Sequence, residues 1–346
     1  MRQAVLWICL IVVLASTGCE RRRMQHECDA GNPAACGTLG EMLRNGSAEA
    51  RARAVPYLMK ACDAKDMRAC FSLADMNWRG EVSGRYDDKK AMDALNRGIA
   101  IDKEKALAMQ QEACDAGKAT GCLNLGVMYG FGQGVAKDET KAAQFLQKAC
   151  DAGSAEGCAE LGMMYANGQG VVKDETKAAQ ILQKACDAGN PSGCANLGAM
   201  YAMGHGVAKD ESKGAELYQK ACDAGETEGC SGLAILFATG AGVKQDAAKA
   251  MQLYQKACEA DDAISCWALG LMYSAGVGVP KDGTKAKQLY DKACKGGASF
   301  ACTWESNSQL CAQMEPMLVS GSKAALNQMC ASMKELRTAA IGIKNF

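Results

Sequence analysis

Apolar residues in the middle of the chain recur at the spacing of one helix face. Between residues 157 and 171, Leu161, Met164 and Tyr165 lie three and four positions apart, one turn after Cys158. This spacing predicts an amphipathic helix. A second apolar stripe follows within residues 173–186 and comprises Ala178, Ile181, Leu182 and Ala185. The pattern therefore predicts two consecutive helices, each with one buried face.

Polar and small residues divide the two helices. The run from Asn167 to Gly170 contains two glycines that break the first helix, because glycine adopts left-handed dihedrals freely. Asp174 is the expected N-cap of the second helix. Gly189 is suited to a left-handed cap at its end, and Asn190-Pro191 to the start of the next helix. Each unit thus reads as helix, turn and helix.

Cysteines repeat with the same period as these helices. Eight pairs have seven residues between their members, and from Cys114 onward the first member recurs every 36 residues. The pairs are Cys28-Cys36, Cys62-Cys70, Cys114-Cys122, Cys150-Cys158, Cys186-Cys194, Cys222-Cys230, Cys258-Cys266 and Cys294-Cys302. A fixed period of this length is typical of a solenoid, in which each repeat packs on its neighbours.

The position of each pair predicts a local disulfide. The first cysteine falls in the last turn of one helix and the second in the first turn of the next, antiparallel helix. Their Cα atoms can then reach the roughly 4.4–6.8 Å that a disulfide needs. Zinc would favour cysteines two to four residues apart with histidine, whereas this chain has only two histidines, His26 and His205. We therefore predict eight disulfides, an oxidising compartment and no metal site.

Several sequence strings carry a family resemblance. They are Lys-Ala-Cys-Asp-Ala-Gly, Gly-Cys-Ala-Asn-Leu-Gly-Ala-Met-Tyr and Gly-x-Gly-Val-x-Lys-Asp. They resemble the Sel-one-like repeat family, and the cysteine pairs make the chain most similar to the Helicobacter cysteine-rich proteins within it. The resemblance covers residues 28–302. It implies an all-α fold, a right-handed α/α superhelix related to tetratricopeptide arrays.

The amino terminus has the layout of an export signal. Arg2 precedes an apolar run that is too short to span a membrane, and small residues then lead to Cys19. This resembles a bacterial lipoprotein signal over residues 1–18, although Ser16 stands where such signals most often have Leu. The alternative is an ordinary secretory signal. Removal of Cys9 and use of Cys19 for lipid would leave an even number of cysteines, 18, which favours the lipoprotein.

These observations give a domain organisation. A tether, residues 19–27, leads from the lipid anchor to the repeat array over residues 28–302. The spacing from Cys70 to Cys114 is 16 residues longer than in later repeats, which places an insert near residues 81–100, with a short helix predicted over residues 87–97. Residues 303–346 are the expected C-terminal helical cap, closed by a Cys311–Cys330 disulfide.

Charge and composition exclude some function classes. The chain has 39 Lys and Arg against 39 Asp and Glu, so no net positive field attracts it to nucleic acid. No motif indicates a cofactor. The predicted location is the bacterial cell envelope, lipid-anchored and either periplasmic or surface-exposed. The main function hypothesis is a scaffold whose concave face binds a protein, a peptide or a peptidoglycan-derived ligand.

The alternative hypothesis comes from the resemblance, since some cysteine-rich relatives are described as penicillin-binding or as β-lactamases. Ser320 and Lys323 have the S-x-x-K spacing, and Tyr165 with Asn167 has the Y-x-N spacing. The third element, K-[ST]-G, is absent. Ser320 also lies where a helix cap is expected, and Tyr165 and Asn167 lie at a helix end. The sequence therefore favours a scaffold over a weak hydrolase, and it gives no catalytic residue.

Overall fold

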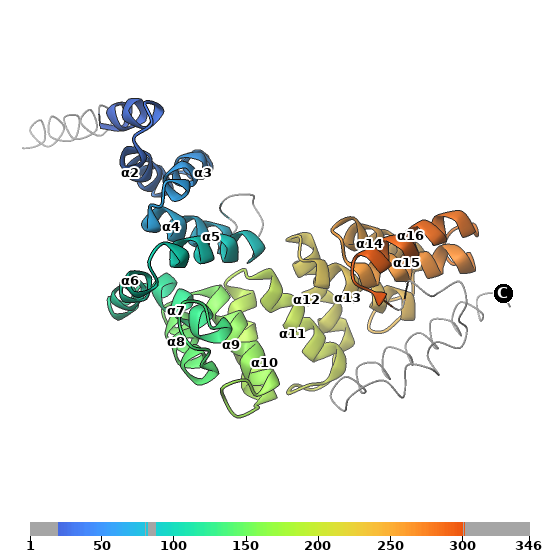
Figure 1. Cartoon of the computed structure of the whole chain (residues 1–346). Helices are drawn as coiled ribbons and strands as arrows, with labels where there is room; N and C mark the ends of the chain where they lie inside the picture. Colours follow the sequence, from blue (N-terminus) through green and yellow to red (C-terminus); the bar gives the residue numbers. More distant parts are fainter. Residues whose placement is uncertain (1–19, 80, 82–87, 300, 302–346) are drawn as a thin grey trace, which may run out of the picture. The chain divides into compact units, whose positions relative to one another are not determined.

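The computed structural model describes residues 20–79, 81, 88–299 and 301, and its secondary structure there is helical (Figure 1). The chain forms two compact units, residues 1–173 and 174–346, each of which is described by itself. The helices of the first unit are α2 (Pro33–Arg44), α3 (Ala48–Asp63), α4 (Met67–Trp78), α5 (Asp88–Ile101), α6 (Lys103–Asp115), α7 (Ala119–Phe131), α8 (Glu139–Asp151) and α9 (Ala155–Asn167). Residues 20–29, ahead of α2, are also helical.

The second unit continues the alternation of helices. Its helices are α10 (Glu175–Asp187), α11 (Pro191–Met203), α12 (Glu211–Asp223), α13 (Thr227–Thr239), α14 (Ala247–Glu259), α15 (Ala263–Ala275) and α16 (Gly283–Lys295). We call the helix that begins just before the second cysteine of a pair the A helix, and the helix that ends with the first cysteine of the next pair the B helix. The A helices of this unit are α11, α13 and α15.

Local sequence sets the ends of the helices as expected. Asp174 caps α10, since its carboxylate accepts a hydrogen bond from the backbone N–H of Lys177 at 2.9 Å. An A helix ends on a left-handed glycine, such as Gly168 with φ +73° after α9. Asn190 caps α11, and Pro191 occupies its first position. From α7 onward the glycine after the A helix and the Asp cap of the B helix recur every 36 residues, whereas the N-cap residue of the A helix varies, and Lys118 and Glu226 make no side-chain cap.

The two stripes predicted from sequence form the core. Leu161 and Leu182 are fully buried, and Ala178 and Ala185 are buried beside Leu182 in α10. A glycine inside the A helix allows the B helix to approach closely. A Cβ on Gly270 would lie 2.6 Å from the ring of Tyr290 in α16, so a larger residue there would force the helices apart.

A glycine in the loop between the A and B helices makes the contact between repeats. A Cβ on Gly206, which has φ +66°, would lie 2.2 Å from the backbone carbonyl carbon of Glu175 in the preceding B helix. Gly242 has the same relation to Glu211, at 2.2 Å. The loop thus rests directly on the backbone of the previous repeat, which no residue with a side chain could do.

The insert of the sequence corresponds to helix α5, and α6 follows it. The expected helix over residues 87–97 corresponds to α5, which runs to Ile101, where Asp102 caps α6. Helix α5 packs on α4, because a Cβ on Gly98 would meet the Phe71 ring at 2.9 Å. Helix α6 carries Cys114, the cysteine of the next corner. In other repeats one B helix packs on its A helix and also carries the cysteine. Here α5 packs on α4, and α6 carries Cys114.

Candidate functional site

Among the described residues, seven disulfides occupy the corners between B and A helices. Their Cα–Cα distances are 4.5–4.8 Å. The bonded pairs are Cys28–Cys36, Cys62–Cys70, Cys114–Cys122, Cys150–Cys158, Cys186–Cys194, Cys222–Cys230 and Cys258–Cys266. Each pair joins neighbouring helices, as the spacing predicts. Disulfides of this kind indicate an extracytoplasmic protein.

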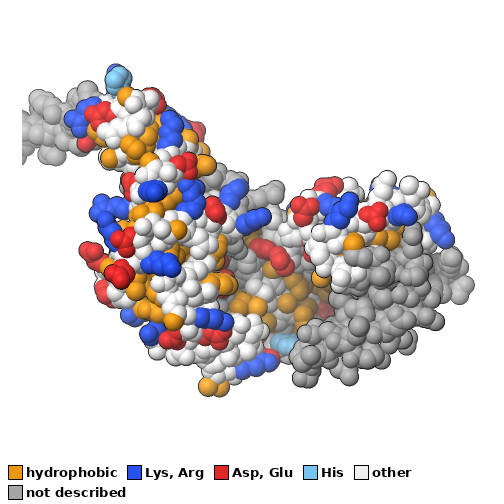
Figure 2. Space-filling model, viewed as in Figure 1, with side chains coloured by type: hydrophobic (Ala, Val, Ile, Leu, Met, Phe, Trp, Pro, Cys, Tyr) orange, Lys and Arg blue, Asp and Glu red, His pale blue; other side chains and the backbone are white. Residues whose placement is uncertain are grey.

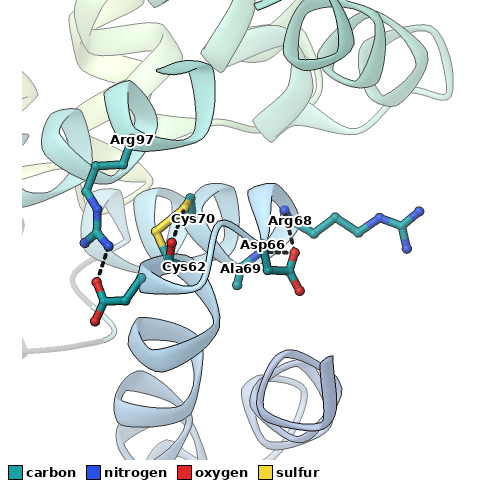
Figure 3. The surroundings of a disulfide bond; sticks show 7 residues. Cys62, Asp66, Arg68, Ala69, Cys70 and Arg97 are labelled. Carbon is teal, nitrogen blue, oxygen red and sulfur yellow. Dashed lines mark hydrogen bonds and ion pairs between the residues drawn. A yellow bond between two sulfur atoms is a disulfide. The ribbon is translucent and has the colours of Figure 1, made fainter. Parts of the chain in front are cut away.

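Figure 3 shows one such corner, between α3 and α4. The Asp66 carboxylate accepts hydrogen bonds from the backbone N–H groups of Arg68 and Ala69, at 3.0 and 3.3 Å, and so caps α4 beside the Cys62–Cys70 bond. Arg97 reaches across from α5 and forms an ion pair with Asp63 at the end of α3. The corner is thereby connected to the next repeat.

Several predicted site residues lie outside the described residues. They are Cys19, Cys302, Ser320 and Lys323, together with the proposed Cys311–Cys330 pair. The described pair of the Y-x-N match, Tyr165 and Asn167, belongs to the last turn of α9, with Tyr165 half-buried and Asn167 exposed as the final residue of the helix. A helix end followed by a left-handed glycine accounts for both residues.

The structure reveals a row of lysines at the corners of the second unit that sequence reasoning missed. Each lies in the last turn of a B helix, and its Nζ donates a hydrogen bond to the backbone carbonyl of the first cysteine in the preceding repeat. The pairs are Lys220 with Cys186 at 2.9 Å, Lys256 with Cys222 at 2.7 Å and Lys292 with Cys258 at 2.7 Å. We call these three lysines the lysine ladder. Their 36-residue spacing was the available signal.

The ladder adds a charged donor to a carbonyl in the last turn of a B helix. The carbonyl of Cys186 belongs to the last turn of α10, where the helix dipole is negative, so an ammonium is favourable there. The Cys186 carbonyl also accepts the N–H of Gly189 at 3.0 Å. Each lysine therefore caps the helix of the repeat before its own and connects two repeats.

The exposed face of the A helices differs along the chain. On α2 and α4 it carries an ionic cluster around a buried carboxylate, whereas α7 exposes Phe131, which has the repeat position of Met203. Arg44 of α2 forms an ion pair with Asp75 of α4, whose side chain is 5% exposed, and Arg79 binds the same carboxylate at 3.0 Å. Burial lowers the pKa of Arg44, and the neighbouring Glu41 carboxylate opposes that shift.

Each A helix of the second unit exposes one large apolar side chain. Met203, Ile235 and Ile264 are 48%, 42% and 50% exposed on α11, α13 and α15. Met203 and Ile235 stand nine and five residues after the second cysteine of their pairs, and Ile264 stands two residues before it. These positions are four and seven residues apart, which is about one and two helical turns, so the three side chains lie on one side of the A helices. Ile235 occupies the repeat position that Asp75 has in the first unit, five residues after the second cysteine of its pair. The three are single side chains on three separate helices, so the apolar face they form is sparse rather than a continuous patch.

Carboxylates border this apolar face. Ser192 of α11 donates a hydrogen bond to Glu226, the N-cap residue of α13, at 2.6 Å. A hydrogen bond with the Glu226 carboxyl lowers the pKa of Glu228, while burial opposes that shift. Glu228 is therefore negatively charged at neutral pH. Ile264 has the position in its repeat that Glu228 has in the previous one, so apolar and acidic groups are neighbours.

Other kinds of site are not apparent in the described part of the chain. Among those residues, no three His, Cys, Asp or Glu side chains gather in a way that could hold a metal ion. The described helices include none with the length and apolar character to cross a membrane. On the view in Figure 2, basic and acidic side chains are interspersed over α2 to α8.

Comparison with known proteins identifies the repeats. The Sel1 repeat pattern matches residues 68–93, 119–154, 155–190, 191–226, 227–262 and 263–297. No curated protein matches the chain. Among solved structures, the antigen c5321 of uropathogenic Escherichia coli is 21% identical, with a TM-score of 0.54, covering 92% of this chain and 73% of its own.

Two further structures are similar. A Sel1 repeat protein from Oxalobacter formigenes is 24% identical with a TM-score of 0.54, covering 86% of this chain and 92% of its own. Helicobacter pylori cysteine-rich protein B is 36% identical, with a TM-score of 0.32, covering 38% of this chain and 95% of its own. The first two support the fold alone. They confirm the predicted fold class, an all-α solenoid of disulfide-linked helical repeats. Because the repeat pattern covers more than half of the 346 residues, the chain belongs to the Sel1 repeat family.

Proposed function

We propose that the protein is a lipid-anchored scaffold of the bacterial cell envelope, and that the A-helix face of its second unit binds a peptide segment of a partner protein. The observation that carries the proposal is the apolar face formed by Met203, Ile235 and Ile264. Burying such side chains against a partner releases about 25 cal/mol per Å² of apolar area. A helical scaffold held by disulfides keeps these side chains in place before a partner binds, which lowers the entropy cost of binding.

The surface favours a peptide over a peptidoglycan fragment. A glycan requires many hydrogen-bonding groups, whereas the three exposed side chains here offer only apolar contact. The acidic border at Glu226 and Glu228 complements a basic side chain. We therefore expect a segment with apolar side chains and at least one Lys or Arg.

Photo-crosslinking in intact cells tests the binding proposal. A photo-reactive amino acid at Ile235 or Ile264 should capture a protein, which mass spectrometry then identifies. The matched control is Gln252, an exposed residue of the B helix α14. The proposal predicts that a purified peptide from the captured protein loses affinity about tenfold or more when Ile235 is replaced by Asp. Capture at Gln252 alone, or of glycan alone, would contradict it.

Lipid attachment is tested separately. Cys19 follows the small residues of the signal, so replacement of Cys19 by Ser should release the protein from membranes into the soluble periplasm or the medium. Arg21→Gln, a change next to the anchor that retains the lipid site, should leave the protein on the membrane. If the Cys19→Ser variant still sediments with membranes, another element anchors the protein.

A further inference from the structure

The lysine ladder lies beside sulfur as well as beside carbonyl oxygen. The Nζ atom of Lys220 is 3.6 Å from Sγ of Cys186, and that of Lys256 is 3.5 Å from Sγ of Cys222. In the disulfide this sulfur is neutral, so the ammonium gains little from it. The arrangement has a consequence when the cysteine is reduced, because the reactive form of a thiol is the thiolate. A positive charge at this distance stabilises that anion.

The charge comes from another repeat. Lys220 is in α12, whereas Cys186 is in α10, and the A helix α11 lies between them in the chain. The ammonium can reach the sulfur only as α12 docks beside α10. Cys186 and its partner Cys194 are each 1% exposed in the packed array, so a disulfide oxidant can reach Cys186 only while the next repeat is docking.

We propose that Lys220 and Lys256 each activate the first cysteine of the preceding repeat for disulfide formation, so that this corner oxidises fastest as the next repeat docks on it. The device couples covalent closure to correct packing. A corner whose neighbour has not yet folded lacks the ammonium and reacts as an ordinary thiol. This inference goes beyond partner binding and does not depend on it.

The chemical step requires a disulfide oxidant, for which glutathione disulfide serves in the test. The Cys186 thiolate attacks one sulfur of that disulfide, forms a mixed disulfide and releases one glutathione thiolate. The Cys194 thiolate then attacks Sγ of Cys186, forms the protein disulfide and releases the second glutathione thiolate. The two protein thiols lose two electrons, which the glutathione disulfide gains, and their protons pass to solvent.

The chain contains internal comparisons. At position 328, 36 residues after Lys292, the sequence has Gln instead of Lys, so no lysine of this register follows Cys294. In the first unit, the Nζ atom of Lys148, at the ladder position of its repeat, lies over the ring of Phe145 at 5.4 Å from the centroid. We therefore expect the Cys114–Cys122 disulfide to form at the rate of a cysteine pair that has no lysine beside its sulfur.

The experiment follows each corner during oxidation of the full chain. Reduced, unfolded protein is diluted into buffer with glutathione disulfide, samples are quenched with iodoacetamide, and peptide mass spectrometry reports closure of every pair. Lys220→Met should slow closure of Cys186–Cys194 about threefold or more. The closure of Cys222–Cys230, which has Lys256, should keep its wild-type rate. Lys213→Met is the matched control, because this lysine of the same helix contacts Tyr201.

Two further results decide the role of charge. Lys220→Arg retains the positive charge and should restore closure of Cys186–Cys194 to nearly the wild-type rate. The proposal is overturned if Lys220→Met closes this pair at the wild-type rate, if it slows all pairs equally, or if Lys220→Arg is as slow as Lys220→Met. Equal slowing of all pairs would show that Lys220 acts through general folding alone.

Discussion

The repeats at α2–α5 and the repeats of the second unit use the same helix corners but connect neighbours differently. Only residues 45–47 separate α2 from α3, whereas residues 204–210 separate α11 from α12. The longer loop carries Gly206, which rests on the backbone of Glu175. At the corner, Arg97 pairs with the Asp63 side chain, whereas Lys220 donates to the Cys186 backbone.

The two corner contacts differ in the group that accepts the charged side chain. The ion pair of Arg97 requires an acidic residue at position 63, whereas every repeat has a backbone carbonyl that a lysine can reach. In the second unit two of the inter-repeat contacts, those of the loop glycine and the ladder lysine, are made to backbone atoms, beside side-chain pairs such as Ser192 with Glu226. These two contacts can therefore recur with the 36-residue unit without a matching side chain in the neighbouring repeat. The residue at the fifth position after the second cysteine is then free to vary, from the buried, ion-paired Asp75 to the exposed, apolar Ile235.

The largest expected effect tests the backbone contact of the long loop. Gly206→Ala should destabilise the second unit by about 3 kcal/mol, because the new Cβ overlaps the Glu175 backbone and the residue keeps a left-handed conformation. Gly189→Ala is the control, since Gly189 has φ +86° and nothing within 4 Å of an added Cβ. It should cost only about 1–2 kcal/mol. Equal losses in denaturant unfolding would show that the loop contact is unimportant.

The next effect concerns the disulfides. Replacing Cys186 and Cys194 with Ser should cost about 2.5 kcal/mol by the chain-entropy model for so short a loop. Each repeat depends on its neighbours, so protection should fall locally, in residues 174–201, and persist around Cys266. Hydrogen-exchange mass spectrometry measures this. Uniform loss of protection along the array would instead indicate one cooperative domain.

The stability of the second unit at alkaline pH reports on the burial of tyrosines in its B helices. Burial raises the pKa of Tyr218 to about 12 and also raises the pKa of Tyr254. The folded pKa exceeds the unfolded value of about 10, so this stability is complete below pH 10 and is lost as the pH rises towards 12. From pH 9 to 11 Tyr218 should account for a loss of about 1 kcal/mol, and Tyr218→Phe should remove that part of the decline. An unchanged pH profile in the variant would contradict the assignment.

The smallest expected losses of stability compare the Arg97–Asp63 ion pair with the hydrogen bond from Lys220 to the Cys186 carbonyl. Arg97→Met should cost less than about 1 kcal/mol, because the pair with Asp63 is partly exposed, and the cost should vanish in 1 M salt. Lys220→Met should cost about 1 kcal/mol. Its cost should fall less with salt, since the carbonyl acceptor is a dipole rather than an ion. If both costs respond equally to salt, the distinction between acceptors fails.

Much of the fold could be predicted from the sequence because each repeat contains the residues that begin, end and bury its own helices. The stripe at Leu182, the cap at Asp174 and the left-handed Gly189 are local features, and the structure contains all of them. The cysteine spacing predicted the corners that carry seven disulfides. Regular repetition made these local signals unambiguous.

Features that depend on neighbouring repeats were harder to predict. The hydrogen bond from Lys220 to Cys186 joins residues 34 positions apart, and a lysine near a helix end already has a sufficient local explanation. The division of one B helix into α5 and α6 required knowing that Gly98 contacts Phe71. The apolar face around Ile235 was missed because exposure follows from which sides of the helices remain uncovered.

The placement of the disulfides gives the chain an uneven resistance to cutting. Each described corner has two covalent connections, the peptide backbone and a disulfide, as at residues 188–190 between Cys186 and Cys194. The loop over residues 204–210 lies between Cys194 and Cys222, outside any described disulfide ring, so the peptide backbone alone crosses it. A protease that cuts a corner leaves the two pieces joined, whereas one that cuts this loop separates them. Partial digestion without reductant should therefore release fragments that consist of whole repeats and that end within loops of this kind.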